Sequence, residues 1–135
     1  MKQHKCRTYF MITGNFDINE IVNTLDLKAY KAYKKGEEYK ISKRVREFDE
    51  IKIGFNDNYN VDINEMIRET LKEISTKIDA LVNLKKELNL EYALILVPEI
   101  YSDSEEPKQI LSLESDIIEF LYLTKTEIDL DYYVY

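Results

Sequence analysis

The fold of this chain is decided by the stretch Asp62-Ile-Asn-Glu-Met-Ile-Arg-Glu-Thr-Leu-Lys-Glu-Ile-Ser-Thr-Lys-Ile-Asp-Ala-Leu-Val-Asn-Leu-Lys-Lys-Glu-Leu-Asn-Leu90. Its apolar side chains recur every three or four residues, which is the spacing of one helix face. This apolar stripe consists of Ile63, Ile67, Leu71, Ile74, Ile78, Leu81 and Leu88. Asp62 and Glu65 have the spacing of a capping box, and Glu73 lies four residues before Lys77, which predicts an ion pair between them. We therefore predict one long amphipathic helix that needs a sheet or other helices to bury its stripe.

The composition indicates an ordered globular protein. The 135 residues are 44% hydrophobic and 33% charged, with only three glycines and two prolines, so we expect a single domain over 1–135. The single cysteine excludes an internal disulfide and a cysteine-based zinc site, and we expect no cofactor. The longest apolar run, 92–97, is far shorter than the roughly 20 residues that span a bilayer. Since the first residues also lack an apolar signal segment, we predict a cytoplasmic protein that does not enter membranes.

Charge is unevenly distributed along the chain. The net charge is −7. Residues 28–46 contain eight Lys or Arg and two Glu, a local charge of +6, whereas residues 99–135 contain ten Asp or Glu and two Lys, a local charge of −8. An acidic protein repels nucleic acid unless its basic residues form a patch, so a nucleic-acid partner is disfavoured.

Strand-like and helix-like segments alternate along the chain. Alternation of apolar and polar residues predicts strands at 6–13, 38–47, 51–55 and 127–135, and the continuous apolar run 92–97 predicts a strand inside a sheet. We place Ile41, Val45 and Phe55 on the inward side of their strands, and read 28–38 as a basic connector. Shorter helices are predicted at 17–27 and at 112–123, the second with Ser112 as its N-cap. This order predicts an α+β fold: a ferredoxin-like β-α-β-β-α-β core extended by a C-terminal α-β, with the helices on one face of a five-stranded sheet.

The rule of right-handed crossovers predicts an open face on this sheet. Applied to each pair of parallel strands, the rule places all the helices on the same side. We expect the opposite side to carry an apolar and aromatic strip between basic and acidic flanks, and such a strip marks a contact surface. Its predicted members are Tyr9, Met11, Leu94 and Leu96 in the strip, beside Tyr92, with Lys40, Arg44 and Arg46 on one flank and Asp129 and Asp131 on the other.

Several segments together resemble one known family. They are the series Tyr9-Phe-Met-Ile-Thr-Gly14, the segment 18–27, Lys34-Lys-Gly-Glu37, the stretch 62–90, the strand 92–97, Leu111-Ser112 and Ile128-Asp-Leu-Asp-Tyr132. In these features the chain is similar to the bacterial domain-of-unknown-function 4279 family over nearly its whole length. The resemblance implies the same α+β fold. The family supplies no catalytic residues to transfer.

Individual polar residues do not form a catalytic constellation. His4, the only histidine, lies in a polar terminal segment, so we expect it to be exposed and inert. Cys6 falls on the inward phase of the first strand and should be a buried small hydrophobe. The loop 102–106 has oxygen ligands but lacks the spacing of a calcium site, so we expect no metal. Asp129 and Asp131 could act as paired carboxylates, or only keep a strand edge solvated.

These observations favour a non-catalytic protein–protein interaction module that uses the open sheet face, with another protein or a second copy as partner. An immunity or antitoxin-like inhibitor is a more specific version. Two other classes stay open. A small-molecule site or an enzyme would use a pocket between the last helix and the sheet edge, lined by Tyr101, Tyr122 and Tyr132. An RNA-binding sheet would use Tyr9 and the basic residues, but the strand 51–55 lacks the expected second aromatic residue on that face.

Overall fold

A computed structural model describes residues 3–59, 62–107 and 111–135. Within these residues the chain forms a mixed α+β structure with four helices and a six-stranded sheet. The elements are β1 (Lys5–Gly14), α1 (Ile18–Leu25), β2 (Tyr30–Tyr33), β3 (Asp49–Tyr59), α2 (Ile63–Leu71), α3 (Ile78–Leu88), β4 (Glu91–Ile100), α4 (Ser115–Thr124), β5 (Glu127–Leu130) and β6 (Tyr133–Val134). We predicted five strands and three helices, so the described part has one more of each.

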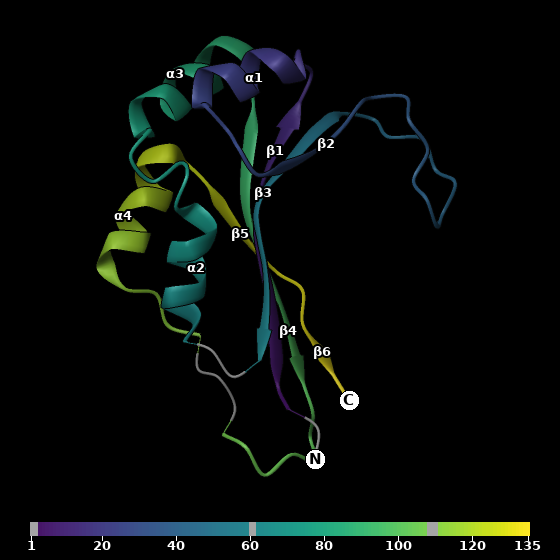
Figure 1. Cartoon of the computed structure of the whole chain (residues 1–135), viewed down its shortest axis with the longest axis vertical. Helices are drawn as coiled ribbons and strands as arrows, with labels where there is room; N and C mark the ends of the chain where they lie inside the picture. The colour runs from purple at the N-terminus through teal and green to yellow at the C-terminus, as the bar shows by residue number, and fades with distance from the viewer. Residues whose placement is uncertain (1–2, 60–61, 108–110) are drawn as a thin grey trace.

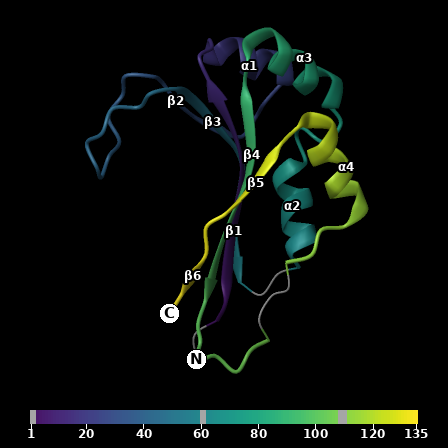
Figure 2. The same cartoon turned by 180° about the vertical axis from the view of Figure 1, so that it is seen from behind.

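The sheet is built around β1. Its strand order is β2-β3-β1-β4-β5, and β6 pairs with the far end of β4. The β2–β3, β3–β1 and β1–β4 pairs are antiparallel, whereas β5 and β6 run parallel to β4. Figures 1 and 2 show α2, α3 and α4 on the same side of the sheet, with α1 next to α3 at its upper end. No helix of the described chain covers the opposite face, which we call the open face.

The core lies between the helices and the inward side of the sheet. Every second residue of β1 from Cys6 to Ile12 is fully buried, and so are Ile51 and Ile53 of β3. Ile67 of helix α2 belongs to the same buried cluster as these strand residues. Burying a side chain of this size contributes about 2 kcal/mol.

The long stretch 62–90 forms two helices, so the prediction of one continuous helix is wrong. The chain leaves helical geometry between Leu71 and Ile78. Glu73 accepts hydrogen bonds there from the backbone N–H groups of Lys28 (2.6 Å) and Ala29 (3.3 Å), and the Lys77 ammonium donates to the Leu25 carbonyl.

These contacts explain the break in the helix. Glu73 and Lys77 anchor the segment that leaves α1, in place of the pair predicted between them. The apolar stripe still points inward on both sides of the break, because Ile67, Ile74 and Leu81 are each fully buried.

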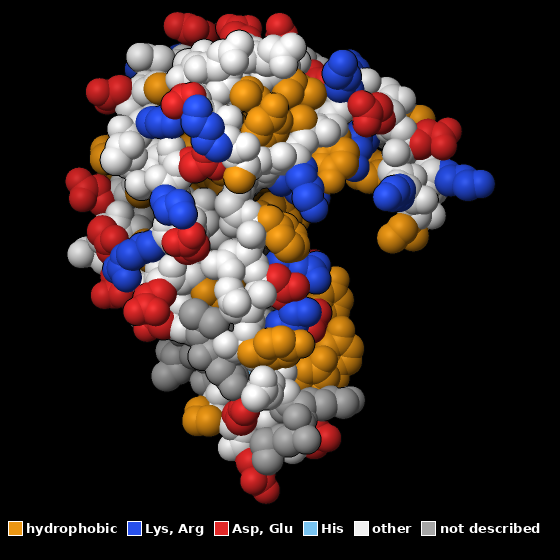
Figure 3. All heavy atoms as spheres, in the orientation of Figure 1, with side chains coloured by type: hydrophobic (Ala, Val, Ile, Leu, Met, Phe, Trp, Pro, Cys, Tyr) orange, Lys and Arg blue, Asp and Glu red, His pale blue; other side chains and the backbone are white. Residues whose placement is uncertain are grey.

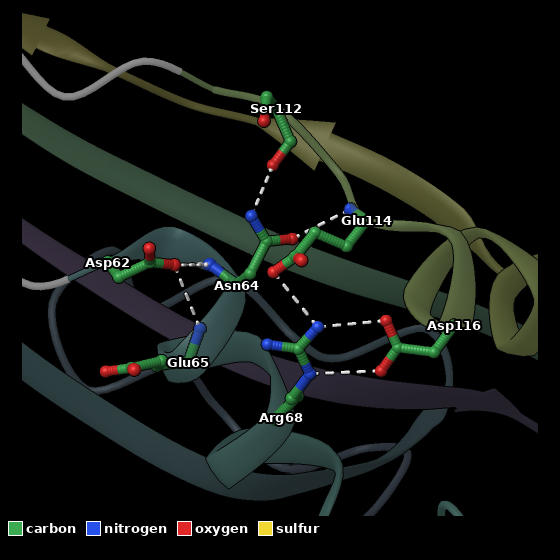
Figure 4. Close-up of polar contacts among 7 residues, drawn as sticks. All are labelled: Asp62, Asn64, Glu65, Arg68, Ser112, Glu114 and Asp116. Carbon is green, nitrogen blue, oxygen red and sulfur yellow. Dashed lines mark hydrogen bonds and ion pairs between the residues drawn. The ribbon is translucent and has the colours of Figure 1, made fainter.

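Polar side chains join the start of α2 to the start of α4 (Figure 4). As predicted, Asp62 caps α2 by accepting from the N–H groups of Asn64 (2.8 Å) and Glu65 (3.2 Å). The buried Asn64 amide donates to the Ser112 carbonyl (2.8 Å) and accepts from the Glu114 N–H (2.9 Å). Helix α4 therefore begins two residues later than predicted, with Glu114 instead of Ser112 at its N-cap.

One arginine completes this junction. Arg68 of α2 donates from Nε and Nη2 to the two Asp116 carboxylate oxygens, at 3.0 and 2.9 Å. Its Nη2 also donates to Glu114 at 3.0 Å. This pairing holds the pKa of the Asp116 carboxyl below its ordinary value of 3.8.

The predicted strand over 38–47 is absent from the structure. Glu38 and Val45 form an isolated bridge, and Ile41 and Val45, predicted to point inward, are 99% and 57% exposed. The edge strand is instead β2, which lies within the predicted basic connector. Alternation alone is a weak signal where no sheet neighbour is available to bury one face.

A bulge interrupts β3 at Gly54. Thr8 pairs with Asn56 and Phe10 with Ile53, so two residues of β3, Gly54 and Phe55, face one of β1. The bulge turns Phe55 away from the core and leaves it 52% exposed, so its predicted inward position is wrong.

The C-terminal segment also differs from its prediction. One strand was predicted over 127–135, but β5 and β6 are separate strands on β4. The predicted strand 92–97 is also longer in the structure, because β4 continues through Pro98 to Ile100.

We expect Gly54→Ala to destabilise the protein by about 3 kcal/mol or more. Gly54 has φ +66°, and a Cβ there would lie 2.0 Å from the Thr70 carbonyl oxygen of α2. Gly36→Ala is the control, since Gly36 also has positive φ but has no atom within 4 Å of a Cβ; it should cost about 1 kcal/mol. Urea unfolding measures both, and equal losses would contradict the packing argument.

We expect Asp116→Asn to lower the free energy of unfolding at neutral pH. A carboxyl whose pKa is depressed in the folded state stabilises the fold above its ordinary pKa, and that contribution is lost as pH falls through the folded value. The difference from the unmodified protein should thus shrink as pH falls from 3.8 and disappear below the lower pKa of the folded state. Urea unfolding at a series of pH values measures it. Asp103→Asn, in an exposed loop, is the control and should show no such pH-dependent difference.

Candidate interaction surface

The register of the strands identifies the residues of the open face. Tyr9 lies opposite Ile95, and Met11 lies opposite Ala93 and Lys52. Directly opposed residues project to the same face. Tyr9 and Met11 are half-buried, and no helix covers them.

Three residues predicted on this surface, Tyr92, Leu94 and Leu96, lie in the core instead. They are buried on the inward side of β4, so Ile95 and Val97 take their place on the open face. A continuous apolar run does not reveal its own phase, and a shift of one residue exchanges the two faces. Ile95 and Val97 are themselves only 7% and 8% exposed, so larger neighbouring side chains form most of this surface.

Aromatic rings and cations interleave at the centre of the open face. The rings of Tyr9 and Phe55, from the neighbouring strands β1 and β3, stack with centroids 6.0 Å apart. The Lys52 ammonium lies 5.0 Å from the Tyr9 ring centroid, and Arg7 and Lys31 lie 5.8 and 5.2 Å from that of Phe55. Such contacts stabilise by about 0.5–1 kcal/mol each at exposed sites.

Arg46 is held at the edge of this face. Its guanidinium lies 4.0 Å from the Tyr33 ring centroid and 4.1 Å from that of Tyr39. Its Nη1 donates to Glu50 at 3.1 Å, in an ion pair whose side chains are only 10% and 14% exposed. The Arg46 Nε is buried and has no hydrogen-bond partner among the described residues. Arg46 therefore fastens both ends of the segment 34–48, which we call the basic loop.

The basic loop protrudes from the sheet and carries exposed Lys and Arg side chains. Lys40 and Arg44, predicted on a strand, are exposed in this loop together with Lys34, Lys35 and the apolar Ile41. Figures 1 and 3 show the loop extending away from the helices, with a hollow between it and the lower part of the sheet. The surface is thus concave on the side of β2.

The acidic flank lies at the other edge of the face. Asp129 of β5 pairs with Ile95, and Asp131 donates its backbone N–H to the Leu96 carbonyl at 2.9 Å. Burial is the main cause that raises the pKa of the Tyr9 hydroxyl; Glu50, Asp131 and Asp129 raise it further, and Arg7 lowers it. Both aspartates therefore lie within electrostatic reach of the centre.

Aromatic side chains extend the acidic flank. The Tyr133 hydroxyl donates to Asp131 at 3.3 Å, and its ring stacks with that of Tyr135 at 6.4 Å. The ring of Tyr135 also stacks with that of Tyr101 at 5.2 Å. Tyr133 and Tyr135 remain about half exposed, so this flank offers rings as well as carboxylates for contact.

The other candidate residues have structural positions. His4 is 2% exposed, contrary to the prediction, because its Nδ1 accepts from the Tyr101 N–H and its Nε2 contacts the Glu106 carbonyl, both at 3.1 Å. Nε2 therefore carries the proton in this arrangement. Cys6 is fully buried as predicted, and burial raises the pKa of its thiol to about 11.

The predicted tyrosine pocket does not form as one site. Tyr122 lines a cavity of about 660 Å³ between α4 and β5, and Tyr132 lines a separate cavity of about 290 Å³. Tyr101 lines neither of these two cavities and stacks on Tyr135. Within 3–59, 62–107 and 111–135, no three His, Cys, Asp or Glu side chains gather as metal ligands. No helix in these ranges is long and apolar enough to cross a membrane.

Sequence reasoning missed Phe55, Arg7, Lys31 and Lys52 as members of this surface. The signal that could have found Phe55 is Gly54, because a glycine inside a strand often marks a bulge. Lys31 could have been placed on this face only by knowing that β2 is a strand. That strand forms by pairing with β3, and its own sequence does not reveal the pairing.

Comparison with known proteins identifies the family of this chain. The chain belongs to the family described as Domain of unknown function (DUF4279), whose family model matches residues 4–135. The resemblance inferred from the sequence is thereby confirmed. No curated protein and no solved structure matches the chain.

We expect Arg46→Ala to loosen the basic loop. Removing two ring contacts and an ion pair should lower the opening free energy by about 2 kcal/mol, or about thirtyfold in amide exchange. The reporter is the Tyr39 N–H, which donates to the Arg44 carbonyl at 2.8 Å. Hydrogen exchange followed by NMR measures it. Glu47→Ala, exposed in the same loop, is the control; unchanged exchange in Arg46→Ala would show that another contact holds the loop.

Proposed function

We propose that residues 1–135 form a single-domain, non-catalytic protein–protein interaction module that binds its partner on the open face of the sheet. The observation that carries this proposal is that no helix of the described residues covers the open face. It presents the rings of Tyr9 and Phe55 among cations at its centre, a protruding basic loop at one edge and acidic tyrosine-rich strands at the other. Aromatic and arginine side chains are the types enriched at protein interfaces.

We also infer that the first four strands and their helices form a ferredoxin-like core. The strand order β4-β1-β3-β2, with every neighbouring pair antiparallel, supports this inference. In such a core the helices cover one face of the sheet, and no helix covers the other face. The architecture thus accounts for why a chain of this length keeps a large face available.

The test is site-specific photo-crosslinking in the cells that make the protein. Benzoylphenylalanine replaces Phe55 or Tyr133, two exposed aromatic residues of the open face, so each change is conservative in shape. Glu119, exposed on the outer side of α4, is the control position. We expect protein adducts from the two open-face positions and none from Glu119. If neither open-face position yields an adduct, the proposed function is wrong.

A second candidate, binding of single-stranded nucleic acid, is favoured by one specific observation. Phe55 lies beside Tyr9 on neighbouring strands, so the face has two stacking residues, although the second was not predicted on the strand 51–55. Asp129 and Asp131 oppose it, since their charges reach Tyr9 and repel phosphate. Adducts at Phe55 that are sensitive to nuclease and resistant to protease would favour this candidate over the first.

A further inference from the structure

We propose that the partner of the open face is a second copy of this chain, joined face to face about a two-fold axis that runs parallel to the strands. This inference rests on the proposed function, and it identifies the partner. It is carried by the placement of opposite charges at the two edges of one face: the basic loop follows β2, and Asp129 and Asp131 belong to β5 and the segment after it.

The geometry of the sheet makes these edges self-complementary. In the order β2-β3-β1-β4-β5, β2 and β5 are the outer strands and β1 is central. A two-fold axis parallel to the strands and lying between two facing sheets places β2 of each copy opposite β5 of the other. The basic loop of each copy then meets the acidic flank of the other, so the same contact occurs twice in the dimer, as an isologous interface requires.

The position of the loop along the strands agrees with this arrangement. In Figure 1 the free end of the loop lies at about the height of β5 on the vertical axis, and the long strands run close to that axis. A rotation about the strand direction does not change height. The loop of one copy therefore reaches the level of β5 in the other, and the hollow in Figure 3 lies where the partner's edge would enter.

The centre of the open face can pack against the centre of the same face in the second copy. Tyr9 and Met11 of β1 lie on the axis and contact their own copies, while Phe55 of β3 faces the side of β4. Three strands of about ten residues and two of four span about 600 Å² at ordinary strand spacing. The loop adds to this, and a standard interface takes about 800 Å² from each partner.

Two alternative partners fit less well. Edge-to-edge pairing of β5 with its own copy would place acidic residues against each other, because Glu127 and Asp129 share the open side of that strand. A uniformly acidic partner would suit the basic loop but would be repelled by Asp129 and Asp131. Only a partner with both signs of charge in this order satisfies both edges, and the chain itself has that order.

The test exchanges the charges at each edge and measures mass in solution. One variant carries Lys40→Glu and Arg44→Glu in the loop, and the other carries Asp129→Lys and Asp131→Lys; all four side chains are exposed. We expect the unmodified chain to sediment as a dimer and each variant alone to dissociate at least about 100-fold more readily. Mixing the two variants should restore a heterodimer, because both of its loop-to-edge contacts then join opposite charges.

A matched control carries Lys72→Glu and Lys86→Glu, the same change of charge on the exposed helical side, and should remain a dimer. Circular dichroism checks that each variant folds. Should one variant fail to fold, the salt dependence of the unmodified dimer is the second measurement, and Kd should rise about tenfold between low and high salt. A monomeric unmodified chain, a Kd insensitive to salt, or folded variants that do not combine would overturn the proposal.

The two proposals can fail separately. Crosslinks from Phe55 and Tyr133 to a different protein, together with a monomeric chain in solution, would support the interaction module and overturn the second copy as its partner. Crosslinks between two copies of the chain would support both. Absence of any adduct would overturn the proposed function, whatever the mass in solution.

Discussion

The close contact between helix α2 and strand β3 is the constraint on which the rest of the structure depends. At position 54 only a hydrogen fits, since a Cβ would lie 2.0 Å from the Thr70 carbonyl oxygen. Nearby, the hydroxyls of Thr8 and Thr70 hydrogen-bond at 2.6 Å in the buried layer. The helix can therefore approach the sheet closely on one side. The local backbone required for this, with positive φ and an extra residue, is the bulge that turns Phe55 to the opposite side.

This single contact links the core to the candidate interaction surface. Without the bulge, Phe55 would continue the inward alternation of Ile51 and Ile53, and Tyr9 would have no aromatic neighbour on the open face. Because of the bulge, the rings of Tyr9 and Phe55 stack at the centre of that face, with Lys and Arg side chains beside them. The same residues that bury the helix thus determine which side chains are available to a partner.

Polar anchors position the elements around this centre. Glu73 and Lys77 hold the chain after α1 against the break between α2 and α3, and Asn64 with Arg68 joins α2 to α4. Arg46 does the same for the basic loop by lying between two tyrosine rings. The first two of these anchors connect residues at least 45 positions apart in the chain, so local sequence alone gives little indication of them.

The sequence by itself determined the α+β class, the inward side of β1, the apolar stripe of α2 and α3, the cap at Asp62 and the separation of basic from acidic segments. These features depend on local periodicity and composition, which any folded state must satisfy. Tertiary structure alone decided the phase of β4, the reversal of Phe55, the break in the long helix and the burial of His4. Each of these depends on a partner distant in sequence: β1 for the phase of β4, Tyr9 for Phe55, the chain after α1 for the break, and the segment 101–106 for His4.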